Sequence, residues 1–138
     1  MQATYRQQSI EVGVLAKRGV GALVIALVVN LALGWAVLTA DLVGSTEFFQ
    51  YPAIALWTTL GIAGATGVYG TVTRLSDNPD RTFVRLAGAV LVVSMLPNIG
   101  LIVAGDTVST SEGVGLMALH VPPAIVAVLA LPDRSPVE

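Results

Sequence analysis

A few polar side chains interrupt long apolar runs, and they are the residues of this sequence whose types could do chemistry. Asn30, Thr58, Asn98 and His120 each lie inside a largely apolar stretch. Only His120 can gain or lose a proton near neutral pH. Counted at about 1.5 Å per helical residue, all four lie about 10–15 Å below the same outer surface. They could therefore line one polar pocket, suited to a small polar or cationic ligand.

The same side chains also have a purely structural interpretation. Asn and His often hydrogen-bond a neighbouring helix in membrane proteins, a contact worth about 0.6 kcal/mol on average. Three prolines stand beside them, and we expect these prolines to kink their helices: Pro97, Pro122 and Pro123. Each proline leaves the carbonyl four residues earlier without its helical donor, so that carbonyl needs a partner from elsewhere. A ligand pocket and helix–helix hydrogen bonding both remain open.

The remaining composition excludes several classes of function. The chain has no cysteine, which removes disulfides, thiolate catalysis and cysteine-ligated metals. Its single histidine leaves no His-rich metal site within one chain. A net charge of −2 provides no basic surface for nucleic acid. We find no catalytic motif or nucleotide fingerprint, and we expect no metal, no cofactor and no enzymatic activity.

Four apolar stretches must position the polar residues. The chain is 54% hydrophobic and only 12% charged, whereas soluble domains have about 25% charged residues. The stretches cover approximately residues 19–39, 52–72, 83–105 and 113–131. Each is long enough to cross a hydrocarbon core of about 30 Å as a helix. Helix-start signals at Asn78-Pro79-Asp80 and Ser109-Thr110-Ser111-Glu112 precede the last two. The sequence predicts an all-α, integral membrane four-helix bundle, forming a single membrane domain over residues 1–138.

The distribution of charge predicts how the bundle is oriented. All seven basic residues flank the ends of the spans that share one face: Arg6, Lys17, Arg18, Arg74, Arg81, Arg85 and Arg134. The two opposite loops contain acids and no base. Basic residues favour the cytoplasmic side, so we expect a multi-pass protein of the cell membrane with both termini in the cytoplasm. Residues 1–18 are expected to form either a cytoplasmic tail or an interfacial helix.

Small residues indicate where helices approach each other, because lipid gives apolar side chains no reason to leave it. In the first span they recur every four residues and form one stripe. In the second span they recur every three residues, so the pattern drifts around the helix and serves several faces. The predicted helix-packing residues are Ala22, Ala26 and Gly34 in the first span, and Gly61, Gly64, Gly67 and Gly70 in the second.

Three short motifs support a resemblance to a known family. Arg81-x-x-x-Arg85 begins the third span, Leu96-Pro97 lies within it, and Leu119-His120-Val121 lies in the fourth. With the short length and four spans, the chain resembles a family of small four-helix membrane proteins of unknown function found in archaea and actinobacteria. The resemblance covers nearly the whole chain. It implies the same topology and no particular function.

These observations favour a non-enzymatic helix-packing or interaction module, such as a homo-oligomer or an accessory subunit. Its partners would be the lipid bilayer and either a second copy or another membrane protein. The alternative is a small-solute carrier or sensor that uses the polar pocket in the outer half of the bundle.

Overall fold

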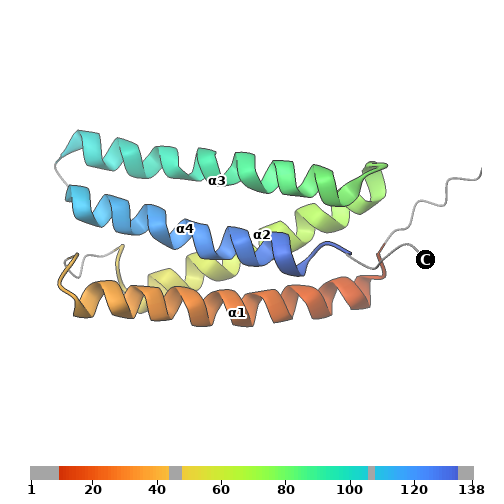
Figure 1. Cartoon of the computed structure of the whole chain (residues 1–138), viewed down its shortest axis with the longest axis horizontal. Coiled ribbons are helices and arrows are strands. Elements are labelled where there is room, and N and C mark those ends of the chain that lie inside the picture. The colour runs from red at the N-terminus through yellow and green to blue at the C-terminus, as the bar shows by residue number, and fades with distance from the viewer. Residues whose placement is uncertain (1–9, 44–47, 106–107, 134–138) are drawn as a thin grey trace, which may run out of the picture.

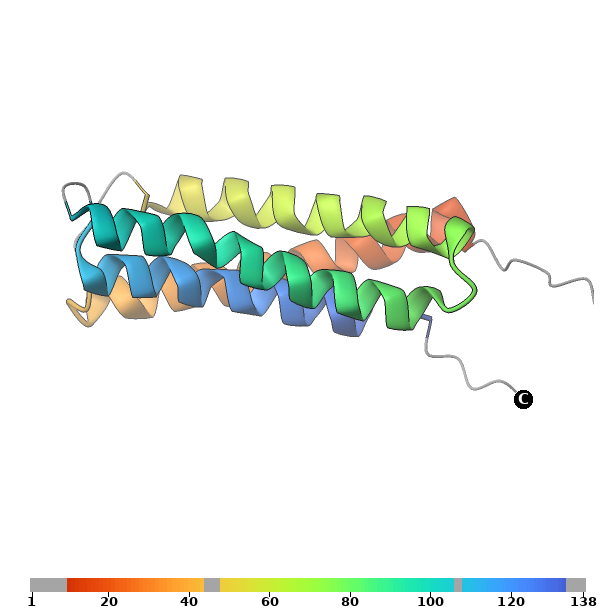
Figure 2. The same ribbon diagram turned by 90° about the horizontal axis from the view of Figure 1, so that it is seen from above.

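The computed structural model describes residues 10–43, 48–105 and 108–133. Within these ranges the chain forms four helices and no strand. The helices are α1 (Val12–Thr39), α2 (Tyr51–Leu75), α3 (Pro79–Ala104) and α4 (Thr110–Ala130). Consecutive helices run antiparallel along one long axis, as Figures 1 and 2 show. The predicted all-α four-helix bundle is thereby confirmed.

All four helices are long and apolar enough to cross a membrane. Large apolar side chains cover the outside of the bundle, including Val28 on α1, Leu56 on α2, Val92 on α3 and Leu129 on α4. A soluble protein rarely exposes apolar surface on every side. The architecture therefore indicates a multi-pass membrane protein.

The ends of the helices follow local sequence signals. Ser109 and Glu112 form the capping box at the start of α4: Glu112 N donates to Ser109 Oγ (3.2 Å), and Ser109 N donates to a Glu112 carboxylate oxygen (2.8 Å). Pro79 occupies the first turn of α3, where its missing N–H costs nothing. Gly105 follows the last residue of α3 as its C-cap, and its φ of 73° lies in the left-handed region that glycine adopts without strain.

α1 begins at Val12, earlier than the apolar run that starts at Gly19. Residues 12–18 are therefore its first turns, and the expected place of residues 1–18, as a cytoplasmic tail or at the interface, stays a prediction. No proline interrupts the chain between Val12 and Gly19, so the helix continues past Lys17 and Arg18. Residues 1–9 lie outside the described part of the chain.

The first turns of α1 and the last turn of α4 lie at the same end of the bundle (Figures 1 and 2). We call this end the basic end, because it carries Lys17, Arg18, Arg74, Arg81 and Arg85. α1 and α3 make no contact with each other, and α2 and α4 pack against both. Between them the buried side chains form two clusters. The cluster nearer the basic end centres on Tyr69, Phe83 and Leu131, and the other on Phe49, Ile54 and Leu119.

α1 packs through its stripe of small residues. Ala22 and Ala26 are 1% and 0% exposed, and Gly34 is buried. A Cβ on Gly34 would lie 2.7 Å from Ile54 Cδ1 of α2, so only hydrogen fits there without a shift of the isoleucine. The helices α3 and α4 continue unbroken through Pro97 and through Pro122 and Pro123.

Candidate functional site: a buried asparagine junction

Asn30 lies buried between three helices, in the half of the bundle away from the basic end. Its side chain is 2% exposed. The amide nitrogen Nδ2 donates to Thr58 Oγ1 of α2 (2.8 Å) and to the backbone carbonyl of Leu119 in α4 (2.9 Å). Thr58 is itself 3% exposed. Two of the four polar residues predicted from the sequence are thus in direct contact, and together they join α1, α2 and α4.

The Leu119 carbonyl is available to Asn30 because of a proline. In a regular helix this carbonyl would accept from the backbone N–H of residue 123, but Pro123 has none. A carbonyl without a donor is costly in a membrane, where no bulk water can replace it. Asn30 supplies the missing donor from the neighbouring helix. The proline and the asparagine are therefore complementary, although they lie in different helices.

The carbonyl oxygen of the same amide has no hydrogen-bond partner. Asn30 Oδ1 is buried, and no donor among the described residues reaches it. Rotating the amide would place this oxygen against the Leu119 carbonyl, which is another acceptor, so the observed orientation is the favourable one. An unpaired buried acceptor costs about 1–3 kcal/mol. Asn30 Oδ1 can therefore accept one further hydrogen bond, from a donor such as a water or a small polar ligand.

Asn98 and His120 bond to their own helices. Asn98 is 7% exposed, and its Nδ2 donates to the Ser94 carbonyl at 3.4 Å. His120 Nδ1 lies 2.7 Å from the Leu116 carbonyl. Because a carbonyl can only accept, Nδ1 must carry the proton, which leaves Nε2 as the acceptor of the neutral ring. Within the described chain no hydrogen bond joins either residue to Asn30 or Thr58, so the shared pocket of all four stays a prediction.

The predicted packing glycines of α2 divide into two groups. Gly70 faces α1, where a Cβ would lie 2.8 Å from Leu15 Cδ2. Gly61, Gly64 and Gly67 are exposed, and a Cβ on any of them would meet no atom of the described chain within 4 Å. These three glycines face away from the other helices. A packing role for them concerns a partner outside the chain and stays a prediction.

Two close helix contacts use glycines that the sequence pattern did not single out. A Cβ on Gly19 of α1 would lie 2.9 Å from the Thr66 side chain of α2. A Cβ on Gly113 of α4 would overlap the Ile102 side chain of α3. Gly19 lies three residues before Ala22, about one turn closer to the N-terminus and on the buried side of α1, so its position relative to the stripe was a usable signal. Gly113 has Gly115 in the same turn of α4, but no small residue of α4 recurs from it at the spacing of four that marks the α1 stripe.

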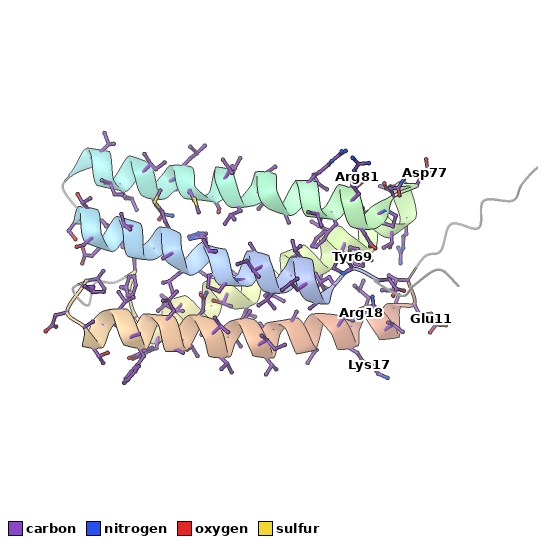
Figure 3. All side chains as sticks on the ribbon, viewed as in Figure 1. Glu11, Lys17, Arg18, Tyr69, Asp77 and Arg81 are labelled. Atoms are coloured by element: carbon purple, nitrogen blue, oxygen red, sulfur yellow. The ribbon has the colours of Figure 1, made fainter. Side chains whose placement is uncertain are left out.

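A second polar cluster, also missed from the sequence, lies at the basic end. The Tyr69 hydroxyl donates to Asp80 Oδ1 (2.7 Å) and accepts from the backbone N–H of Asp133 (3.0 Å). Arg18 binds Asp133 Oδ1 (3.1 Å) and the Leu131 carbonyl (3.2 Å). Figure 3 shows Tyr69 and Arg18 at this end. Residues from α1, α2 and α3 and from the segment after α4 meet here, which holds the four helices together.

The sequence signal for this cluster was the tyrosine Tyr69, near the end of the second span, where small residues are frequent. Tyr69 is 1% exposed and packs edge-on against Phe83, with ring centroids 5.1 Å apart. A buried tyrosine needs a partner for its hydroxyl. The sequence alone does not say which of the nearby acids supplies it.

The fold and these two polar clusters define a four-helix multi-pass membrane protein whose buried polar groups connect helices. A model described as "Family of unknown function (DUF6069)" matches residues 10–136 of the 138-residue chain, and the chain belongs to this family. No curated protein and no solved structure matches the chain.

Proposed function

We propose that the chain is a helix-packing module that associates with a second membrane-embedded helix through the outer face of α2. The observation that carries this proposal is the exposed position of Gly61, Gly64 and Gly67, with open space at each. A glycine inside a helix costs about 1 kcal/mol relative to alanine. No helix of the described chain uses the space that these glycines leave. Close approach by a helix from outside accounts for them.

The outer face of α2 has the spacing that such an approach needs. Ala63, Gly67 and Thr71 follow one another at intervals of four, and all three are exposed. Thr71 Oγ1 donates to the Gly67 carbonyl (2.9 Å), so its hydroxyl is already paired within α2. The stripe therefore consists of small side chains, and the hydroxyl of Thr71 already has a hydrogen-bond partner within α2. Residues four apart lie on one side of a helix, and small residues at this spacing let two backbones approach closely.

Self-association is tested most directly with the purified full-length chain. We expect an oligomer in mild detergent, and we expect Gly67→Leu to convert it to a monomer, because the leucine side chain would hold the two backbones apart. Light scattering measures the mass of the protein component. The matched control is Gly21→Leu, an exposed glycine of α1 whose Cβ also meets nothing within 4 Å. A wild-type monomer, or a Gly67→Leu oligomer as stable as that of Gly21→Leu, would contradict self-association through this face of α2.

We also infer that both termini face the cytoplasm. The support is the distribution of the bases: all five bases of the described residues lie at the basic end, and the described residues of the opposite end include acids, Asp41 and Glu112, but no base. Basic residues near the ends of spans are enriched on the cytoplasmic side. The basic end would accordingly lie in the cytoplasmic leaflet.

One observation favours the alternative of a small-solute carrier or sensor, namely the unpaired Asn30 Oδ1. A ligand with a donor group could occupy it, with Thr58 beside it. Asn98 and His120 bond to their own helices, and no hydrogen bond of the described chain joins them to Asn30 or Thr58. The helix-packing role does not require these four side chains to share a pocket, and it is therefore the better supported of the two.

A further inference from the structure

Two hollows on the α3–α4 side of the bundle share one residue. The first, of about 470 Å³, lies at the basic end and is lined by Asp80, Arg81, Val84, Arg85 and Pro132. The second, of about 270 Å³, lies between the two helices, and its apolar lining includes Val84, Gly88 and Leu91 of α3 and Ala124, Ile125 and Val128 of α4. Because Val84 lines both, the second hollow continues the first along α3. A charged surface thus leads directly into an apolar groove.

The charge in the first hollow is positive and partly uncompensated. Arg81 and Arg85 are exposed and four residues apart, so their side chains emerge on one face of α3. Neither guanidinium forms an ion pair with a carboxylate of the described ranges. Asp80 also lines the hollow, but its Oδ1 accepts the Tyr69 hydroxyl. Two cations against one acid leave a net attraction for an anion. Figure 3 shows Arg81 at this end of α3.

We propose that the two hollows together bind one anionic phospholipid. Its phosphate lies on Arg81 and Arg85, and one acyl chain lies in the groove between α3 and α4. Guanidinium groups match the geometry of phosphate oxygens, and basic pockets at the ends of membrane helices attract anionic headgroups. The groove extends about 9 Å along α3 from Arg85 to Leu91, at about 1.5 Å per residue. Gly88 keeps this part of the groove open.

The juxtaposition distinguishes a lipid from other occupants. A free phosphate ion would use the arginines and leave the apolar groove unexplained. A partner helix would use the groove, and the enrichment of bases at this end would account for the arginines, but neither explains why the arginines border the hollow that continues into the groove. A phospholipid has both a phosphate and acyl chains, and in a membrane the phosphate lies at the interface while the acyl chains lie deeper. This site lies on α3 and α4, and it does not depend on the face of α2 proposed for self-association.

The test is a lipid titration of the full-length protein in detergent, read by native mass spectrometry. The probes are phosphatidylglycerol, which is anionic, and phosphatidylcholine, which has the same phosphate but no net charge. We expect tighter binding of phosphatidylglycerol, and a loss of about 25-fold in R81Q/R85Q, from about five-fold per arginine. The matched control is K17Q/R74Q, which removes the same charge from exposed residues of the same end outside the hollow. We expect it to change the affinity by less than two-fold.

Gly88→Leu tests the groove separately from the charge. A Cβ at Gly88 meets nothing within 4 Å, so the helix accepts the substitution, and the longer side chain fills the groove. We expect several-fold weaker binding of phosphatidylglycerol, with circular dichroism unchanged. The proposal is overturned if K17Q/R74Q weakens binding as much as R81Q/R85Q, or if phosphatidylcholine binds as tightly. It is also overturned if Gly88→Leu has no effect, or if millimolar inorganic phosphate displaces the lipid.

Discussion

Asn30 replaces, from a neighbouring helix, the donor that Pro123 removes. Its amide hydrogens go to the Leu119 carbonyl and to Thr58, and both bonds are buried. Asn30→Leu would leave the Leu119 carbonyl without a donor at membrane depth. We expect the free energy of unfolding to fall by about 1–3 kcal/mol. Reversible unfolding in mixed micelles, followed by circular dichroism, measures the change.

A second substitution separates this structural role from a ligand pocket. Pro123→Ala restores the backbone N–H that can serve the Leu119 carbonyl, so Asn30→Leu should cost less in the Pro123→Ala background. A double-mutant cycle gives this coupling directly. If Asn30→Leu is as stable as the wild type, the junction is not structural, and the pocket interpretation becomes the stronger one.

Glycines lie at close contacts in the α1–α2 and α3–α4 pairs, and in the α3–α4 pair that glycine is Gly113. A Cβ there would overlap Ile102 Cγ1 as well as Cδ1. Cγ1 is attached next to the branch point of the isoleucine, so it moves only if the side chain changes rotamer or the helices separate. We expect Gly113→Ala to lower the free energy of unfolding by about 1–3 kcal/mol, as overpacked sites do. The same mixed-micelle unfolding measurement applies.

Gly100→Ala is the matched control for this element. Gly100 lies on α3, is exposed, and has nothing within 4 Å of a Cβ. Its replacement should be neutral or slightly stabilising, because alanine favours a helix more than glycine does. Equal stabilities of the two variants would show that the Ile102 side chain or the two helices can shift at Gly113 without cost.

The orientation of the whole molecule can be measured because the chain contains no cysteine. A single cysteine introduced by Asp77→Cys lies exposed in the loop at the basic end, and one introduced by Leu42→Cys lies exposed at the opposite end. With both termini in the cytoplasm, a membrane-impermeant thiol reagent should label only the Leu42→Cys variant in intact cells. After permeabilisation it should label both. Labelling of Asp77→Cys alone in intact cells would reverse the proposed orientation.

The number and approximate positions of the helices were predictable from the sequence. A hydrocarbon environment requires each spanning segment to pair its own backbone groups, so long apolar runs between charges become helices. The capping box of Ser109 and Glu112 was equally predictable, because it is made within one turn. So was the stripe that includes Ala22 and Ala26, since spacing of four places small residues on one side of a helix. The start of α1 at Val12 was left open between a tail and a helix, because an apolar run shows where lipid begins and not where a helix begins.

Contacts between helices were decided only by the tertiary structure. In a soluble helix the polar face shows which side is outside, but here nearly every face is apolar. The sequence therefore could not show that Gly61, Gly64 and Gly67 face outward while Gly113 faces a neighbour. It also could not show that Asn30 binds the particular carbonyl released by Pro123. Each of these contacts depends on the order and the rotation of the helices in the bundle. Packing and hydrogen bonds between helices determine that order and rotation, whereas hydrophobic periodicity does not.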